Sequence, residues 1–347
     1  MTKMIGYIGT YTKGDSKGVY SFTLDTEKTT ISEASLVAEL GDPTYVAIST
    51  DNRNLYAIDK QSSRSGLASF TINEETGKLT PLHHQLAEGI SACHVSVNKA
   101  NSAVFTASYH QGLVQAYPVI DGALQPVSSF SQHEGSGPHE RQEKPHTHYA
   151  GLTPDEQYVV TVDLGTDEIT TYVYNEQMLS QIHTLSTRPG SGPRHITFHP
   201  NGKYAYVMTE LSNEVITLAY NAADGSFKEI QYISTLPEGF TENAQGSAIH
   251  ISSDGRFVYA GNRGPDNIAI FSVNSLTGEL TLVEHTSTEG NWPRDFALDP
   301  TEKFLVASNQ ESNNLTLFAR DVATGKLTLL QSNVHVPNPV CVKFLNV

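Results

Sequence analysis

Cysteine is almost absent from this chain. Only Cys93 and Cys341 occur among its 347 residues, and both fall inside alternating, strand-like patterns. Two cysteines cannot supply the several disulfides that small secreted domains use in place of a large core. We therefore expect free thiols and a cytoplasmic location.

Long apolar runs are also missing. No stretch reaches the roughly eighteen apolar residues that a membrane-spanning helix needs. The N-terminal MTKMIGYIGT lacks the apolar core of a signal peptide. Both absences predict a soluble, non-exported protein with no membrane partner.

Positive charge is scarce. The chain has 22 Lys and Arg against 37 Asp and Glu, a formal net charge of −15. Nucleic acid and anionic membranes attract basic surfaces, so this balance predicts neither as a partner. A small anion is compatible with it, provided that a few basic side chains gather in one place.

Three common catalytic motifs are absent as well. The chain contains no G-x-S-x-G elbow, no Walker loop and no G-x-G-x-x-G. A nucleophilic serine hydrolase, an NTPase and a dinucleotide-dependent enzyme are therefore disfavoured.

What the chain does contain is a repeat of strand, tight turn and strand. Its clearest copy, GSGPRHITFHPNGKYAYVMTE at 190–210, alternates apolar and polar residues on both sides of a His-Pro-Asn-Gly turn. Positions matching Pro200, which we call turn positions, recur 46 to 55 residues apart. They are Thr50, Lys99, Pro154, Pro200, Ser253 and Pro300. A seventh copy is split, with its first strand at the C-terminus and its second at the N-terminus.

A second hairpin follows each of these first hairpins. Thr-Gly or Asp-Gly marks the turn in the clearest copies, such as 69–79 and 271–280. Seven units of four strands are typical of an all-β, seven-bladed β-propeller, in this chain one domain over 1–347. The split copy predicts that the C-terminal strand is the innermost of a blade whose other three strands come from 4–39.

Antiparallel pairing in the inner hairpins is expected to bring polar residues to one mouth of the central channel. Residues six before each turn position, and nine or ten after it, lie about equally far from the turn. These positions include His148, Asp163, Arg194, Glu210, Asn262, Arg263 and Arg294. Arginine grips carboxylate and phosphate through its planar fork, so the cluster predicts an anion site.

Histidines are frequent near the same mouth. Four fall in the long polar connection 131–148, namely His133, His139, His146 and His148. Their spacing matches no strong zinc motif and no cysteine lies beside them, so we expect no metal, and we expect no cofactor. Two others, His195 and His250, lie within inner strands, where a structural and a catalytic role are equally open.

Several segments together resemble the seven-bladed lactonase family over the whole chain. They are GSGPHERQEKPHTH (135–148), DLGTDEI (163–169), GSGPRHITFHPNGKYAYVMTE (190–210), SAIHISSDGRFVYAGNRG (247–264), WPRDFALDP (292–300) and SNQESNN (308–314). That family includes propeller-type 6-phosphogluconolactonases and a fungal carboxy-cis,cis-muconate cyclase. The resemblance implies hydrolysis of 6-phosphoglucono-δ-lactone to 6-phosphogluconate in the pentose phosphate pathway. Action on another carboxylated lactone, or its cyclisation, is the alternative.

The resemblance also implies roles for individual residues. The proposed site of the cyclase, one His, two Arg and one Glu, looks like His148, Arg194, Arg263 and Glu210, with His146 as a second candidate for the histidine. We expect Glu210 or His148 to act as general base, and the two arginines to stabilise an oxyanion or carboxylate.

The remaining site predictions concern substrate binding. Arg294 and His195 are the candidate phosphate ligands. Other expected substrate-binding residues are His146, Asp163, His250 and Asn262. The expected partner is a small anionic lactone, and the expected assembly is a monomer or weak homodimer. A non-catalytic propeller that binds proteins is a third reading, but such a scaffold has no reason to converge Arg, His and Glu on one mouth.

Overall fold

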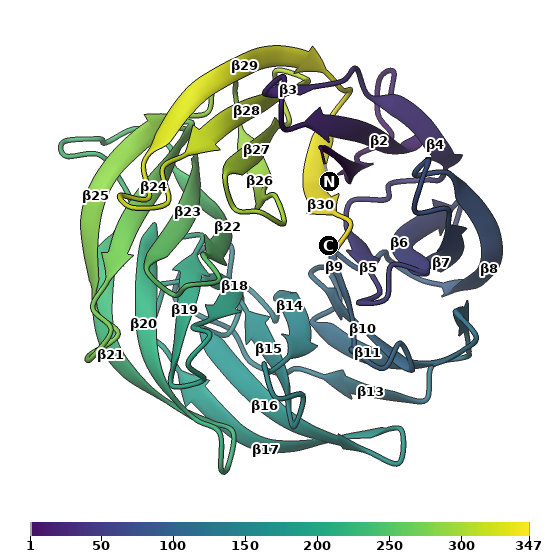
Figure 1. The fold of residues 1–347 in the computed structure, drawn as a ribbon. Coiled ribbons are helices and arrows are strands. Elements are labelled where there is room, and N and C mark those ends of the chain that lie inside the picture. Colours follow the sequence, from purple (N-terminus) through teal and green to yellow (C-terminus); the bar gives the residue numbers. More distant parts are fainter. Residues whose placement is uncertain (1, 347) are drawn as a thin grey trace.

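The computed structural model describes residues 2–346, which form seven antiparallel sheets arranged as a ring about a central axis (Figure 1). Every regular element in this range is a β-strand, and no helix able to cross a membrane occurs in it. The predicted fold class and blade number are confirmed.

Six blades follow one another along the chain, and the strands of each are named in order from the channel outward. Blade 1 has β5 (Val46–Ile48), β6 (Asn54–Gln61), β7 (Arg64–Ile72) and β8 (Leu79–Glu88). Blade 2 has β9 (His94–Val97), β10 (Ala103–Ser108), β11 (Leu113–Ile120) and two outer strands, β12 (Ala123–Leu124) and β13 (Ser129–Gln132), which pair with different parts of β11. Blade 3 has β14 (Thr147–Leu152), β15 (Val159–Asp163), β16 (Glu168–Asn175) and β17 (Met178–Ser186).

The next three blades have the same order. Blade 4 has β18 (Pro193–Phe198), β19 (Tyr204–Thr209), β20 (Glu214–Asn221) and β21 (Ser226–Ser234). Blade 5 has β22 (Gln245–Ile251), β23 (Phe257–Arg263), β24 (Asn267–Val273) and β25 (Leu280–Ser287). Blade 6 has β26 (Pro293–Leu298), β27 (Phe304–Asn309), β28 (Asn314–Arg320) and β29 (Leu327–His335).

Blade 7 closes the ring with both ends of the chain. Its innermost strand is β30 (Pro339–Phe344), which pairs with β1 (Lys3–Thr10). Outside β1 lie β2 (Gly18–Asp25) and then two short strands, β3 (Thr30–Ile31) and β4 (Ser35–Glu39). Figure 1 shows both chain ends beside β30. The predicted closure is confirmed.

The core lies between neighbouring blades, because the second strand of each blade is buried on both faces. In β6, Leu55 and Ala57 pack in a cluster shared with blade 7, whereas Tyr56 and Ile58 pack in a cluster shared with blade 2. Alternate side chains of a strand point to opposite faces, so each such strand serves two clusters. The second strands, with which the channel-lining strands pair, are consequently packed on both faces.

The inner strands are irregular where they reach the mouth. In five blades their pairing with the second strand shifts register near the mouth, and in blades 3 to 6 the shift includes the residue six before the turn position. The residues at these shifts are His148, Arg194, Ser247, Arg294 and Val340. A β-bulge leaves a residue without a ladder partner and redirects its side chain. Simple side-by-side pairing, the sequence-based expectation, is therefore wrong at these positions.

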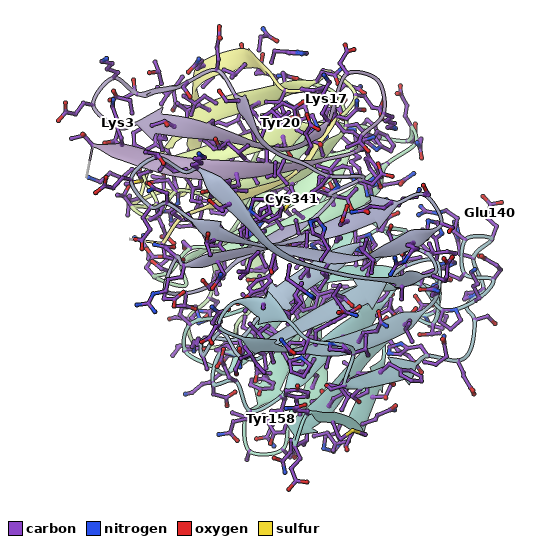
Figure 2. The ribbon with its side chains drawn as sticks, turned by 90° about the vertical axis from the view of Figure 1, so that its right-hand side faces the viewer. Lys3, Lys17, Tyr20, Glu140, Tyr158 and Cys341 are labelled. Atoms are coloured by element: carbon purple, nitrogen blue, oxygen red, sulfur yellow. The ribbon has the colours of Figure 1, made fainter. Side chains whose placement is uncertain are left out.

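The long connection between β13 and β14 stands out from one side of the ring. Figure 2 shows Glu140 at that side and Lys3 at the opposite one. Two side chains anchor the connection to blade 3: His133 Nδ1 lies 2.8 Å from Asp163 Oδ2, and Gln142 Nε2 donates to the Leu164 carbonyl at 2.8 Å.

Candidate active site

A cavity of about 510 Å³ opens at the channel mouth on the side of the long connection. Titratable side chains from six segments contribute to its lining. They include Lys60, Arg141, His148, Glu210, Arg263 and Arg294. The predicted convergence of arginine, histidine and glutamate on one mouth is thus present in the structure.

The Glu210 carboxylate is the centre of this charge cluster. Its Oε2 accepts from Arg194 Nε at 3.0 Å and lies 2.7 Å from Arg263 Nη2. Its Oε1 accepts from Arg141 Nη2. Three guanidinium groups against one carboxylate leave a local excess of positive charge, which suits an anionic ligand.

Backbone carbonyls fix the two inner arginines further. Arg194 Nη1 donates to the Ser247 carbonyl at 2.7 Å, and Arg263 Nη2 donates to the Gly246 carbonyl at 2.6 Å. Both side chains are almost completely buried. Their positions are therefore set before any ligand arrives.

These contacts decide the ionisation of Glu210. Burial alone would raise its pKa, but the charges of Arg263 and Arg194, with a smaller contribution from Arg141, hold it well below its usual range. Glu210 is a carboxylate whose two oxygens are already engaged by arginines. It has little tendency to accept a proton.

His148 lies at a register shift of β14 and lines the cavity. Its ring is 5.7 Å from that of Tyr109 and 5.1 Å from that of His195, and its Nδ1 is buried with no hydrogen-bond partner in residues 2–346. Burial, reinforced by the Arg194 charge, holds its pKa well below its usual range. The imidazole is neutral at physiological pH and available as a base.

Arg294 lies at the corresponding position of β26 and is partly exposed to the cavity. Its guanidinium is 5.6 Å from the centroid of the Tyr11 ring. Within residues 2–346 it forms no hydrogen bond or ion pair, in contrast to the arginines around Glu210. It remains able to bind an anion.

His195 lies one residue deeper in its strand than Arg194. Its ring centroid is 5.5 Å from that of His94 and 6.0 Å from those of both Tyr45 and Tyr149, so the four rings form one aromatic cluster. Burial and the Arg194 charge hold its pKa well below its usual range. A neutral ring is a poor phosphate ligand, so the structure disfavours the predicted role.

Two predicted residues, Asp163 and Asn262, do not reach the cavity. Asp163 accepts hydrogen bonds from the His146 backbone and the Thr147 hydroxyl, and so holds the long connection. The side chain of Asn262 accepts a hydrogen bond from the Thr235 hydroxyl. Asp163 and Asn262 are both fully buried. Each lies nine residues after its turn position, whereas the cavity-lining Glu210 and Arg263 lie ten after theirs. Strand alternation therefore sends the two kinds of side chain to opposite faces.

Two predicted histidines are also placed elsewhere. His146 stacks on Tyr109 at 4.2 Å, with Nε2 3.1 Å from Glu143. His250 lies 3.2 Å from Asp295 and lines a separate depression together with Lys343. His146 supports the cavity wall from behind, and His250 lies deeper along the channel.

Arg141 is the functional candidate that sequence reasoning missed. It stands in GSGPHERQEKPHTH, one of the segments that carried the family resemblance, but no repeat position predicts it.

Within residues 2–346, no three His, Cys, Asp or Glu side chains converge as possible metal ligands.

Comparison with known proteins agrees with this geometry. Residues 5–344 match the family model described as lactonase, 7-bladed beta-propeller. The chain is 60% identical over 347 residues to the 6-phosphogluconolactonase of Bacillus subtilis strain 168, covering 100% of this chain and 99% of that one. A crystal structure of a Lactobacillus plantarum protein has a TM-score of 0.95 and 40% identity, covering 99% of this chain and 100% of that one.

A gluconolactonase also has the same fold. The periplasmic gluconolactonase of Pseudomonas aeruginosa superposes with a TM-score of 0.94 at 32% identity, over 99% of each chain. From the family match, the relatives and the shared architecture, the chain belongs to the seven-bladed β-propeller lactonase family.

Proposed function

We propose that the protein hydrolyses 6-phosphoglucono-δ-lactone to 6-phosphogluconate, the lactone-opening step of the pentose phosphate pathway. The observation that carries the proposal is the positively charged cavity in which His148 stands beside the Glu210 arginine cluster. The name and 60% identity of the Bacillus subtilis relative support the same substrate.

His148 is the better of the two candidate bases. Both oxygens of Glu210 already contact arginines, whose positive charges stabilise the carboxylate and lower its basicity. His148 is neutral and faces the cavity. Glu210 then acts as a positioning residue that orients Arg194 and Arg263.

The reaction proceeds by addition and elimination at the lactone carbonyl. His148 removes a proton from water as the water oxygen attacks the carbonyl carbon, and the carbonyl oxygen becomes an oxyanion beside Arg194 and Arg263. Collapse of this intermediate breaks the bond between the carbonyl carbon and the ring oxygen. Protonated His148 returns its proton to that oxygen, which yields the hydroxy acid.

A coupled assay tests the proposal. 6-Phosphoglucono-δ-lactone is generated in place and the appearance of 6-phosphogluconate is followed with the purified protein and without it, because the lactone also opens spontaneously. We expect a rate that rises in proportion to protein concentration. A rate equal to the spontaneous background would contradict this function, and a carboxylated lactone would then be the next substrate to assay.

A further inference from the structure

Two positively charged side chains that line the cavity, Lys60 and Arg294, do not contact Glu210. Arg294 forms no ion pair in residues 2–346, and Lys60 Nζ lies 3.5 Å from Asp42 Oδ2, longer than a normal charge-assisted hydrogen bond. Asp42 itself accepts hydrogen bonds from the backbone and hydroxyl of Thr12 through its other oxygen. Lys60 therefore keeps most of its capacity to bind an anion.

Lys60 and Glu210 lie on opposite sides of the mouth. Lys60 is ten residues after the turn position of blade 1, the place that Glu210 occupies in blade 4, and seven blades form the ring. Blades 1 and 4 are as far apart as such a ring allows. A ligand whose carbonyl meets Arg194 and Arg263 thus extends its far end toward Lys60.

Two hydroxyl groups accompany Lys60 in the cavity wall. Ser62 and Ser63 form the tight turn between β6 and β7 and both line the cavity. Neither hydroxyl forms a hydrogen bond within residues 2–346, and both residues are exposed. An ammonium group with free hydroxyl donors matches the several acceptor oxygens of a phosphate monoester.

We propose that Lys60, Ser62 and Ser63, together with Arg294, form a phosphate subsite that makes the enzyme prefer a phosphorylated lactone over its unphosphorylated form. The proposal rests on the function proposed above and deepens it, because it assigns the end of the substrate remote from the reacting carbonyl. Arg294 is on β26, the innermost strand of blade 6, and lines the same cavity as Lys60, so it contributes the second positive charge of the subsite.

Lys60→Met tests the subsite, since it keeps the length of the side chain and removes its charge. We expect kcat/KM for 6-phosphoglucono-δ-lactone to fall about tenfold or more, mainly through KM, as for loss of one charge-assisted hydrogen bond. The rate with unphosphorylated glucono-δ-lactone should stay within about twofold, because that substrate has no group for Lys60 to bind. Lys28→Met is the matched control: Lys28 is also exposed and lies 3.9 Å from an aspartate, Asp25, but it is outside the cavity.

Binding of the product 6-phosphogluconate, measured by calorimetry, separates the subsite from the reaction. Weaker binding by Lys60→Met than by wild type supports the subsite even if the wild-type protein opens neither lactone, a result that would remove only the function. Equal losses on both lactones, or no loss on either, would overturn the subsite while leaving the function standing. Unchanged product binding by Lys60→Met would also overturn it.

Discussion

Arg141 crosses from the long connection between blades 2 and 3 to donate a hydrogen bond to Glu210 in blade 4. It takes the one carboxylate oxygen that Arg194 and Arg263 leave free. Without it, two guanidinium groups would face one carboxylate. With it the cluster has three positive charges and one negative, so the inner arginines keep positive potential for a substrate oxyanion.

Arg141→Met should therefore weaken catalysis without unfolding the protein, because its side chain is 33% exposed. We expect kcat to fall about tenfold or more, as for loss of a charge-assisted hydrogen bond. Arg188→Met provides the control, since Arg188 pairs with Glu214 at 3.7 Å on the exposed surface. Steady-state kinetics of Arg141→Met indistinguishable from those of Arg188→Met would remove Arg141 from the site.

Glu210→Gln should be costly to stability, because it leaves buried guanidinium groups without their counter-charge. We expect a loss of about 3 kcal/mol or more in the free energy of unfolding, the usual result of removing one partner of a buried ion pair. Urea denaturation at pH 7 measures it. A variant as stable as wild type would show that the arginines do not need the carboxylate.

The difference in the free energy of unfolding between wild type and Glu210→Gln should depend on pH in one direction. The folded-state pKa of Glu210 is depressed, so its stabilising contribution is fully present above its unfolded value of about 4.3. As pH falls below that value toward the folded-state pKa, the contribution is lost. The unfolding free energies of wild type and Glu210→Gln should consequently converge in acid, and a gap that widens below pH 4 would contradict the assignment.

Much of the fold and part of the site could be predicted from the hairpin repeat in the sequence. Seven copies of one hairpin fixed the blades, and equal distance from the turn placed Arg194 near Glu210. The same rule wrongly grouped Asp163 and Asn262 with the cavity residues, although strand alternation separates positions nine and ten after the turn. Arg141 could not be located, because no periodicity describes where a long irregular connection places a side chain.

Closure of the ring can be tested by deleting residues 339–347. The deletion removes β30, leaves the inner edge of β1 without its partner, and takes away Lys343, whose Nζ lies 3.6 Å from the buried Asp295. An unpaired edge promotes association with other chains. We expect an unfolded or aggregated product in thermal melts and size-exclusion chromatography. A monomer that melts at the wild-type temperature would show that β30 is dispensable.

His148→Asn distinguishes the two candidate bases. If His148 takes the proton from water, this variant should lose about 10²-fold or more in kcat, the usual range for general base catalysis. Burial and the Arg194 charge depress the pKa of His148, so the wild-type acid limb, where the neutral base becomes protonated, should lie below the ordinary histidine value of about 6.5. That limb should be missing from the residual activity of His148→Asn but present in Glu210→Gln, because Glu210 only positions the arginines. A profile that keeps its acid limb in His148→Asn and loses it in Glu210→Gln would reverse the assignment, and Glu210 would be the base despite the arginines around it.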